Sequence, residues 1–317
     1  MPFNFALIGV AGYIAPRHLK AIRDTGNLLL AATDPHDSVG IIDSYSLETK
    51  FFPEIERFDR HLDKLRRLGE VKRIHYVSIC SPNYLHDAHV RLALRSGAHA
   101  ICEKPLVINP WNLDALQLLE KETHRKVHTI LQLRVHPALL DLKKYLEQNP
   151  PGKKIEVVLT YITGRGSWYQ VSWKGSQERS GGLATNIGIH FFDLLMWLFG
   201  SVSGHEVNLS EQTKMAGLIE LKHANIRWFL SVDTNDLPFP AAPGANTTYR
   251  SLTFDGNELD FTGGFTDLHT RVYEKILAEG LFGIEDARPS IELAYQIRNS
   301  KIREKARHIH PLLLQRG

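Results

Sequence analysis

Cysteine is scarce in this sequence. Only Cys80 and Cys102 occur among 317 residues, and they do not form a C-x-x-C pair. Disulfide scaffolds and cysteine zinc sites both need several thiols at short spacings. The 16 histidines are scattered along the chain. His86 and His89 have helical i, i+3 spacing but lack a third ligand nearby, so we interpret both as surface histidines and expect no metal site.

Long apolar runs and a strong net charge are also missing. The most apolar stretch, Phe191–Gly200, is short and carries Asp193, whereas a membrane-spanning helix needs about 20 apolar residues. No basic region precedes the apolar N-terminal stretch, as it would in a signal peptide. A net charge of +3 gives no electrostatic reason to bind nucleic acid. We expect a cytoplasmic protein without a membrane or nucleic-acid partner.

The first 133 residues alternate buried strands with helical patterns. Strand-like runs occupy Asn4–Val10, Leu28–Asp34, Ile74–Pro82, His99–Leu106 and Lys126–Leu133. Strands that alternate with helices are joined by parallel crossovers. We therefore predict an α/β fold whose N-terminal domain, residues 1–133, is a Rossmann-type, doubly wound parallel sheet.

The alternation of strand-like and helical patterns ends before residues 134–317. Longer strand-like runs follow one another at 153–163, 215–223, 224–233, 249–256 and 257–262, and two helical patterns end the chain at 266–278 and 285–305. The dipeptide Asp255-Gly256 is a hairpin signal between two of these runs. This half is predicted to be an α+β domain for substrate binding and oligomerisation. Its sheet should be large, open and mostly antiparallel, with helices on one side.

The turn after the first strand resembles a dinucleotide-binding loop with one altered letter. The fingerprint is G-x-G-x-x-G/A, and here Gly9 is followed by Ala11 and Gly12. Backbone N–H groups and a helix N-terminus can receive a pyrophosphate in such a turn. Asp34 ends the next strand, where a carboxylate binds both ribose hydroxyls and favours NAD over NADP. An ordinary strand–turn–helix with a surface aspartate is the alternative.

Two further strands also end in polar residues. Ser81 and Asn83 follow the third strand and either contact a cofactor or cap the next helix, which is the commoner role for such residues. Lys104 follows the fourth strand, and would be taken for a surface lysine if it stood alone. Because the carboxyl ends of parallel strands face one crevice, we expect these residues to share it.

A strongly apolar helical pattern, Gly181–Gly200, carries Asn186, His190 and Asp193 in its first turns. Asn186 and His190 are spaced i, i+4 and should share a helix face. A histidine in such a helix is either a buried residue with a hydrogen-bond partner or a catalyst.

The stretch Thr160–Gly175 mixes Arg165 with Trp168 and Tyr169 after a predicted strand. Aromatic rings beside an arginine suit an anionic substrate that carries a ring, such as a nucleotide sugar. A loop at a sheet edge packed with aromatic residues is the alternative.

Together, these motifs resemble the Gfo/Idh/MocA oxidoreductase family over nearly the whole chain. The glycine loop with its following His18, the "SPNYLH" segment, "EKP" and the "GG…GIHFFD" helix occur in the family's order. "AGYIAPRH", "SICSPNYLH" and "GFTDLH" are similar to members that oxidise the C3 hydroxyl of UDP-N-acetylglucosaminuronic acid with NAD. That reaction belongs to the synthesis of diacetamido-uronic acid sugars for surface polysaccharide of the O-antigen type. The resemblance implies NAD as cofactor, a UDP-sugar substrate and a homo-oligomer, either a dimer or a tetramer.

The resemblance also implies residue roles. The cofactor-binding residues would be Gly9, Ala11, Gly12, Tyr13 and Ile14 at the phosphates, Asp34 at the ribose, and Ser81, Pro82, Asn83, His86, Glu103 and Lys104 at the nicotinamide half. The substrate-binding residues would be Lys104, Arg165, Trp168, Tyr169, Asn186 and His190. Lys104 and His190 match the family's active-site pair. Many members have an aspartate where this chain has Asn186, so a carboxylate that would stabilise a protonated His190 is missing.

Removal of a hydride from C3 requires a base for the hydroxyl proton, and a good base has a pKa near the working pH. Histidine titrates near pH 6.5, whereas the pKa of lysine must fall by about three units, or roughly 4 kcal/mol. We predict that Lys104 and His190 form a hydrogen-bonded pair. His190 would accept the proton, and Lys104 would polarise O3 or relay the proton. Arg165 would bind the uronate carboxylate or the pyrophosphate.

Three other functions fit the same motifs. One is a different sugar or inositol dehydrogenase, the second is an NAD-dependent glycosidase that oxidises C3 transiently, and the third is a non-catalytic NAD-linked sensor. The presence of Lys104 disfavours the sensor. NADH would be reoxidised either by exchange with free NAD or by a second, oxo-acid substrate.

Overall fold

The computed structural model describes residues 2–240, 247–254, 256–261, 263–303 and 308–314. The chain divides into two compact units, of which unit 1 comprises Met1–Gln132 and Asp267–Arg288 and unit 2 comprises Leu133–Thr266 and Pro289–Gly317. The first boundary lies one residue from the predicted one. The segment Asp267–Arg288, which the sequence pattern assigns to the second domain, packs with the first instead.

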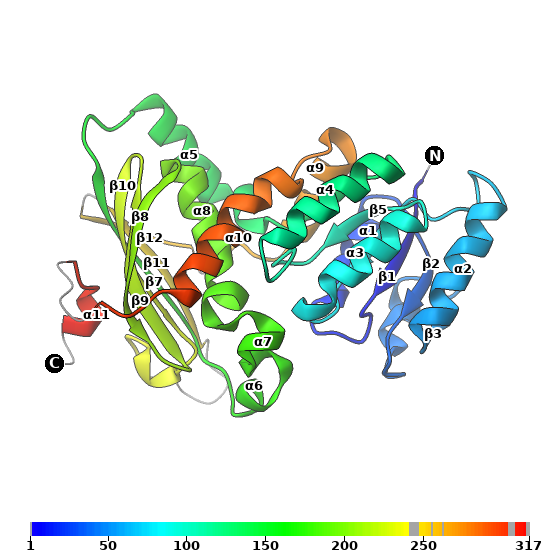
Figure 1. Ribbon diagram of the computed structural model, residues 1–317, viewed down its shortest axis with the longest axis horizontal. Helices are drawn as coiled ribbons and strands as arrows, with labels where there is room; N and C mark the ends of the chain where they lie inside the picture. The colour runs from blue at the N-terminus through cyan, green and yellow to red at the C-terminus, as the bar shows by residue number, and fades with distance from the viewer. Residues whose placement is uncertain (1, 241–246, 255, 262, 304–307, 315–317) are drawn as a thin grey trace. The chain divides into compact units, whose positions relative to one another are not determined.

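Unit 1 is built on a six-stranded parallel sheet in the order β3-β2-β1-β4-β5-β6 (Figure 1). The strands are β1 (Asn4–Ile8), β2 (Leu28–Thr33), β3 (Lys50–Phe52), β4 (Tyr76–Ile79), β5 (His99–Cys102) and β6 (Val127–Thr129). This order is that of dinucleotide-binding folds, in which ligands bind where the strand order reverses, here between β1 and β4. The predicted Rossmann-type sheet is confirmed.

Helices surround this sheet (Figure 1). They are α1 (Ala15–Asp24), α2 (Ile55–Arg67), α3 (His86–Arg95), α4 (Trp111–Thr123) and α9 (Leu268–Glu279), with the start of α10 (Ile284–Asn299). Helix α9 packs against α1, although the two are far apart in the sequence. Neither β3 nor α2 is among the elements expected above, although Ile55, Phe58 and Leu62 of α2 have the spacing of an amphipathic helix.

Unit 2 contains a six-stranded sheet in the order β12-β11-β7-β10-β9-β8. Its strands are β7 (Ile155–Thr163), β8 (Val202–Ser210), β9 (Lys214–Leu221), β10 (Ala224–Ser231), β11 (Thr248–Phe254) and β12 (Asn257–Asp260). Only β7 and β10 pair in parallel among these strands. The predicted, mostly antiparallel sheet is confirmed. The pairing of Phe254 with Asn257 joins β11 to β12, while Asp255 of the predicted hairpin lies outside the described residues.

The two faces of β7 are covered by different segments. Val157 and Leu159 point into the main core, to which α5 (Pro137–Gln148), α8 (Ile189–Phe199) and α10 contribute. Ile162 on the opposite face packs with Phe229 against the C-terminal α11 (Pro311–Leu314). Figure 1 shows α5, α8 and α10 on one side of this sheet and α11 on the other. The alternation follows from the period of two along a strand.

His310 fixes the C-terminal segment to this second face. Its ring stacks on Phe229 at a centroid distance of 5.5 Å. The backbone N–H of Leu312 donates to its Nδ1 at 3.2 Å, and its Nε2 lies 3.1 Å from Thr160 Oγ1. An imidazole that accepts at Nδ1 and donates from Nε2 is neutral. Burial, with a smaller effect of Arg227, lowers the pKa of His310 to about 4.

We therefore expect His310 to make the fold sensitive to acid. A folded-state pKa below the unfolded value means that the stabilisation is complete above pH 6.5 and is lost as the pH falls toward 4. Between pH 7 and 5 the wild type should lose about 2 kcal/mol more unfolding free energy than His310→Gln. Urea unfolding at the two pH values measures this, and parallel losses in both proteins would contradict it.

One helical stretch, Gln177–Phe199, is long and apolar enough to cross a membrane by length and composition alone. However, 78% of its apolar window is buried inside the protein, as in the core helix of a globular domain. The stretch is not a uniform α-helix, since a π-helical turn at Ala184–Gly188 precedes α8.

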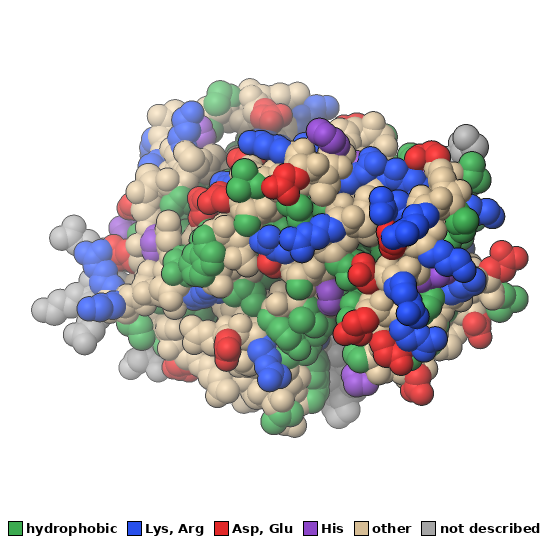
Figure 2. Space-filling view, turned by 45° about the vertical axis from the view of Figure 1, so that its right-hand side comes forward, with side chains coloured by type: hydrophobic (Ala, Val, Ile, Leu, Met, Phe, Trp, Pro, Cys, Tyr) green, Lys and Arg blue, Asp and Glu red, His purple; other side chains and the backbone are tan. Residues whose placement is uncertain are grey.

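Acidic and basic side chains are interspersed over the face shown in Figure 2. In unit 1, Arg66 and Arg67 of α2 both pair with Asp63 at 2.7 Å, and Arg91 of α3 pairs with Asp87 at 2.9 Å. Such exposed pairs contribute little to stability. They do break up the positive field that these arginines would otherwise create.

Candidate functional site

The glycine loop joins β1 to α1 in the way that a phosphate cradle requires. Gly9 has φ +86°, and a Cβ at this position would lie 2.7 Å from the backbone carbonyl carbon of Cys80. The Gly12 N–H donates to the carbonyl oxygen of Gly9 at 3.1 Å. The loop leads directly into α1, and the positive end of this helix can attract a phosphate. The side chain of Tyr13 is 85% exposed, so it is available to a ligand.

Asp34 braces this loop from the end of β2. One carboxylate oxygen accepts the N–H of Ala11 at 3.0 Å, and the other accepts the N–H of His36 at 2.9 Å. A carboxylate can accept further hydrogen bonds, so a ribose hydroxyl can still bind. The bond to Ala11 gives the altered letter of the fingerprint a structural role, because it fixes that backbone without requiring glycine.

His86 is not a surface histidine. It is almost completely buried, and its Nδ1 and Nε2 lie 2.7 Å and 2.8 Å from the carbonyl oxygens of Pro105 and Ser81. Burial lowers its pKa, against a smaller raising effect of these carbonyls. The imidazole therefore ties the segment after β4 to the segment after β5, and its contact with a cofactor stays a prediction.

The capping role expected for Ser81 and Asn83 is not what the structure shows. Within the described chain, neither the turn Asn83–Leu85 nor α3 has a side-chain hydrogen bond at its N-cap. Instead, Ser81 Oγ lies 2.8 Å from Nδ1 of His89. Burial lowers the pKa of His89 to about 4, so this imidazole is neutral. Ser81 and Asn83 both lie at the carboxyl edge of β4, where a cofactor would bind.

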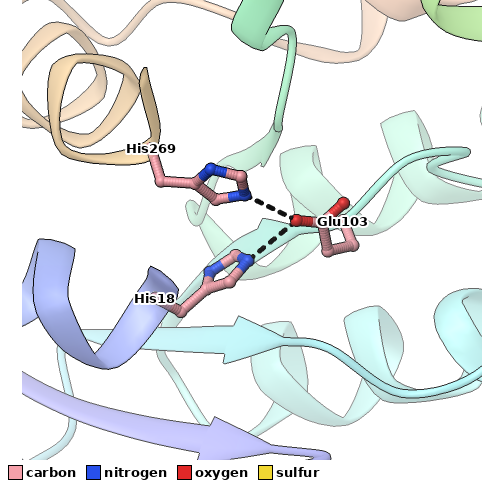
Figure 3. Close-up of side chains that lie close together, drawn as sticks. All are labelled: His18, Glu103 and His269. Atoms are coloured by element: carbon pink, nitrogen blue, oxygen red, sulfur yellow. Dashed lines mark hydrogen bonds and ion pairs between the residues drawn. The ribbon is translucent and has the colours of Figure 1, made fainter. Parts of the chain in front are cut away.

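Glu103 is the centre of a buried hydrogen-bonded cluster beside Lys104 (Figure 3). Its Oε1 lies 2.9 Å from Nε2 of His18 and 2.9 Å from Nε2 of His269. Its Oε2 accepts the backbone N–H of Lys104 at 3.2 Å. The histidines come from α1 and α9, so three segments of unit 1 meet at one carboxylate. Lys104 itself is only partly buried.

In unit 2, the residues expected at the sugar lie around the π-helical turn. Asn186 is buried within this turn, and its Nδ2 donates to Tyr169 Oη at 2.9 Å. His190 follows in the first turn of α8 and is partly buried. The shared face of Asn186 and His190 stays a prediction, because the four-residue step between them runs from this turn into α8. Such turns are frequent at functional sites.

Aromatic rings and cations gather in the segment after β7. Trp168 packs edge-on against Tyr169 at 5.9 Å. The ammonium of Lys174 lies over the rings of Trp168 and Trp173, at 5.4 Å and 4.9 Å from their centroids. Burial, with a further effect of the Arg165 charge, lowers the pKa of Lys174. The charge of Arg165 thus acts on Lys174, and neither cation has an ion pair among the residues that the structure describes, which suits a doubly anionic ligand.

Asp193 is engaged by an arginine. Arg134 binds it in a bidentate ion pair, with Nε 3.0 Å from Oδ2 and Nη2 2.6 Å from Oδ1. Both side chains are largely buried. A buried carboxylate of this kind needs its partner, so Asp193 anchors α8 to the start of unit 2.

The structure thus groups the predicted residues by unit. Gly9, Ala11, Gly12, Asp34, Ser81, Asn83, Glu103 and Lys104 lie at the carboxyl edge of one sheet in unit 1, whereas Arg165, Trp168, Tyr169, Asn186 and His190 belong to unit 2. The hydrogen-bonded pair of Lys104 and His190 stays a prediction. Sequence reasoning misses His269 and Tyr273 as partners of His18, because no local spacing joins α9 to α1.

Comparison with protein families gives matches in both halves of the chain. The oxidoreductase family model with an NAD-binding Rossmann fold matches residues 3–131, and the model of the family's C-terminal alpha/beta domain matches residues 143–236. The curated relatives match in part. D-Glucoside 3-dehydrogenase of Escherichia coli K12 is 30% identical over 136 residues, which are 42% of this chain and 38% of that protein. The chain therefore spans less than half of that relative's length.

Solved structures match over the whole chain. The WlbA (WbpB) dehydrogenase from Thermus thermophilus in complex with NAD and UDP-GlcNAcA is 49% identical, with 98% of this chain and 99% of that chain covered and a TM-score of 0.93. A structure of the same dehydrogenase with NAD and alpha-ketoglutarate is 50% identical over 98% and 99% of the chains, also with a TM-score of 0.93. WlbA from Bordetella pertussis shares the fold at 18% identity, with 93% and 94% covered and a TM-score of 0.76. With a cofactor loop, a parallel sheet and two family domains in order, this chain belongs to the Gfo/Idh/MocA family of NAD-binding oxidoreductases.

Proposed function

We propose that this protein is an NAD-dependent dehydrogenase that oxidises the C3 hydroxyl of UDP-N-acetylglucosaminuronic acid to a ketone. The observation that carries the proposal is the near-complete similarity, at 49% identity, to a dehydrogenase crystallised with NAD and UDP-GlcNAcA. The cofactor edge of unit 1 and the cation–aromatic segment of unit 2 both suit this pair of ligands.

The residues of unit 1 fit NAD. The backbone N–H groups of Tyr13 and Ile14, between the glycine loop and α1, would hold the pyrophosphate, and Asp34 would accept the ribose hydroxyls. A 2′-phosphate would be repelled by this carboxylate, which is why NAD is preferred to NADP. The bound nicotinamide supplies the hydride acceptor.

The proton chemistry falls to Lys104 and His190. His190 takes the proton of the C3 hydroxyl, and the ammonium of Lys104 stabilises the developing charge on O3. No carboxylate stands at position 186 to stabilise a protonated His190. Asn186, held by its bond to Tyr169, would instead bind a sugar hydroxyl.

The negative charges of the substrate fit the cations after β7. A uronate carboxylate and a diphosphate need positive partners, and Arg165 and Lys174 lie in one short segment. Trp168 is half exposed beside them, so its ring can stack on the uracil or the sugar. These contacts would distinguish a charged nucleotide sugar from a neutral sugar or an inositol.

A second, oxo-acid substrate is favoured for the return of NADH to NAD. The related Thermus dehydrogenase was crystallised with NAD and alpha-ketoglutarate, and a dicarboxylate suits the same cations. The proposal further places the protein in the cytoplasm, as a homo-oligomer such as a homotetramer, in the synthesis of surface polysaccharide of the O-antigen type.

The test follows the reduced-nicotinamide absorbance while UDP-sugars are added to the protein with NAD. We expect a signal with UDP-N-acetylglucosaminuronic acid and, after addition of alpha-ketoglutarate, turnover beyond one equivalent. UDP-N-acetylglucosamine, which lacks the carboxylate, and myo-inositol are the matched controls. A signal with inositol alone would favour another dehydrogenase of the family, and release of free sugar would favour the glycosidase.

A further inference from the structure

The cluster in Figure 3 contains three ionisable side chains that the proposed reaction does not use. Glu103, His18 and His269 are nearly inaccessible to solvent. They belong to three segments of unit 1 and are joined by two hydrogen bonds of 2.9 Å. Burial of three ionisable groups costs folding free energy unless each has a hydrogen-bond partner. The partners of each group therefore have to be identified.

A second chain of contacts extends from the cluster. Ser78 Oγ lies 2.7 Å from Tyr273 Oη, which lies 2.7 Å from Nδ1 of His18. With Nε2 of His18 donating to Glu103, each of these contacts can have one donor and one acceptor.

The carboxylate at the end of this chain is ionised. Burial by itself raises the pKa of Glu103, but the hydrogen bonds from His18 and His269 outweigh it and hold that pKa well below its usual range. Burial lowers the pKa of His269, although Glu103 opposes this. The cluster therefore places one ionised carboxylate between two imidazole N–H groups.

We propose that Glu103, His18 and His269 form a positioning triad for Lys104. The remaining carboxylate oxygen of Glu103 accepts the backbone N–H of Lys104 at 3.2 Å, so it holds the peptide from which the lysine projects. His18 lies in α1, the helix that begins directly after the glycine loop. The triad thus locks the lysine segment to the helix that receives the cofactor phosphates. The inference rests on the proposed role of Lys104.

A metal centre is the rival explanation, because one nitrogen from each histidine and one Glu103 oxygen lie within 4.8 Å of one another. Here, however, both imidazoles approach the same carboxylate oxygen at 2.9 Å, the ordinary length of an N–H···O bond. The hydrogen-bond chain from Ser78 and Tyr273 already accounts for the second nitrogen of His18. The geometry therefore favours protons between these groups.

The experiment compares His269→Gln with His269→Leu, and includes Glu103→Gln. Glutamine retains an N–H donor, whereas leucine leaves one lone pair of the carboxylate without a partner. We expect His269→Gln to retain kcat within about twofold, and His269→Leu and Glu103→Gln to lose about tenfold or more. In the two His269 variants the KM for NAD should change by less than about threefold, since His269 is not among the residues expected at the cofactor.

A second readout does not depend on the sugar. The rate at which an acylating reagent modifies Lys104, measured by mass spectrometry on the full chain with NAD present, should change severalfold in His269→Leu but not in His269→Gln. Such a result supports the triad even if the wild type oxidises no UDP-sugar, in which case only the proposed function fails.

Two results would overturn the proposal. One is a lower unfolding temperature in His269→Leu and Glu103→Gln with kcat and Lys104 labelling unchanged, which is what a purely structural cluster predicts. The other is tight, stoichiometric zinc binding by the wild type in calorimetry with zinc alone, lost in Glu103→Gln.

Discussion

Replacing Lys104 by methionine should lower kcat for UDP-N-acetylglucosaminuronic acid by about 10³-fold, while NADH binding stays within about threefold of the wild type. Methionine keeps the length and apolar stem of the side chain but removes the ammonium group. The charge on O3 then develops without its partner, and proton transfer to His190 becomes harder. Cofactor affinity is spared, because it depends on the loop after β1 and on Asp34 after β2.

The matched control is Lys126→Met, at the opposite end of the same sheet. Lys126 is exposed and precedes β6, and its ammonium lies 3.8 Å from Glu120, so its loss should leave kcat unchanged. Steady-state rates from NADH absorbance measure kcat, and a fluorescence titration measures the affinity for NADH. If Lys104→Met retained more than about a tenth of the wild-type kcat, the lysine would have no part in the chemistry.

A companion variant, His190→Asn, separates the two candidate bases. If histidine accepts the proton, kcat of this variant should be as low as that of Lys104→Met. The kcat of the double variant should be only slightly lower still, because the effects of residues that act as a unit are not additive. Near-normal turnover in His190→Asn would move the proton-accepting role to Lys104.

The fold could be predicted wherever buried strands carry continuous apolar runs. The five longer stretches that become β1, β2, β4, β5 and β6 stand out, and their alternation with helices dictates parallel pairing. Helix α2 carries no continuous apolar run and is found instead by its period, because Ile55, Phe58, Leu62 and Leu65 are spaced i, i+3, i+7 and i+10.

The candidate site could be predicted where its residues follow strands, and not where they meet through tertiary packing. Asp34 and Lys104 stand directly after apolar runs, so their place at the sheet edge follows from the chain order. His269 is 166 residues from Glu103 in the sequence, and no local spacing connects them. Gly188 of the π-helical turn likewise meets a residue distant in the sequence, because a Cβ there would lie 2.9 Å from the Leu230 side chain.

A substitution of Gly9 is expected to weaken both NAD binding and the stability of the fold. Gly9→Ala should raise the Kd for NAD by about 100-fold or more and lower the free energy of unfolding by about 3 kcal/mol. Alanine at φ +86° is strained, and its Cβ would meet three backbone atoms of Cys80 and Ser81 at 2.7–2.8 Å. These backbone atoms directly follow the central strand β4, which holds them in place, so the loop must shift away from α1. The N–H groups then no longer converge on one phosphate.

Gly26→Ala is the control that separates backbone strain at positive φ from the steric clash of the added Cβ. Gly26 has a similar φ of +74°, but a Cβ there would meet no atom within 4 Å, and the residue lies after α1, away from the loop. The free energy of unfolding of Gly26→Ala should fall by only about 1 kcal/mol because of backbone strain, and the variant should bind NAD as the wild type does. Thermal unfolding and NADH fluorescence titration of both variants give the comparison. Equal NAD affinity in the two would mean that the close approach of Gly9 to Cys80 does not shape the cofactor cradle. A selective loss in Gly9→Ala would show that the first glycine is required for the space it leaves as well as for its φ.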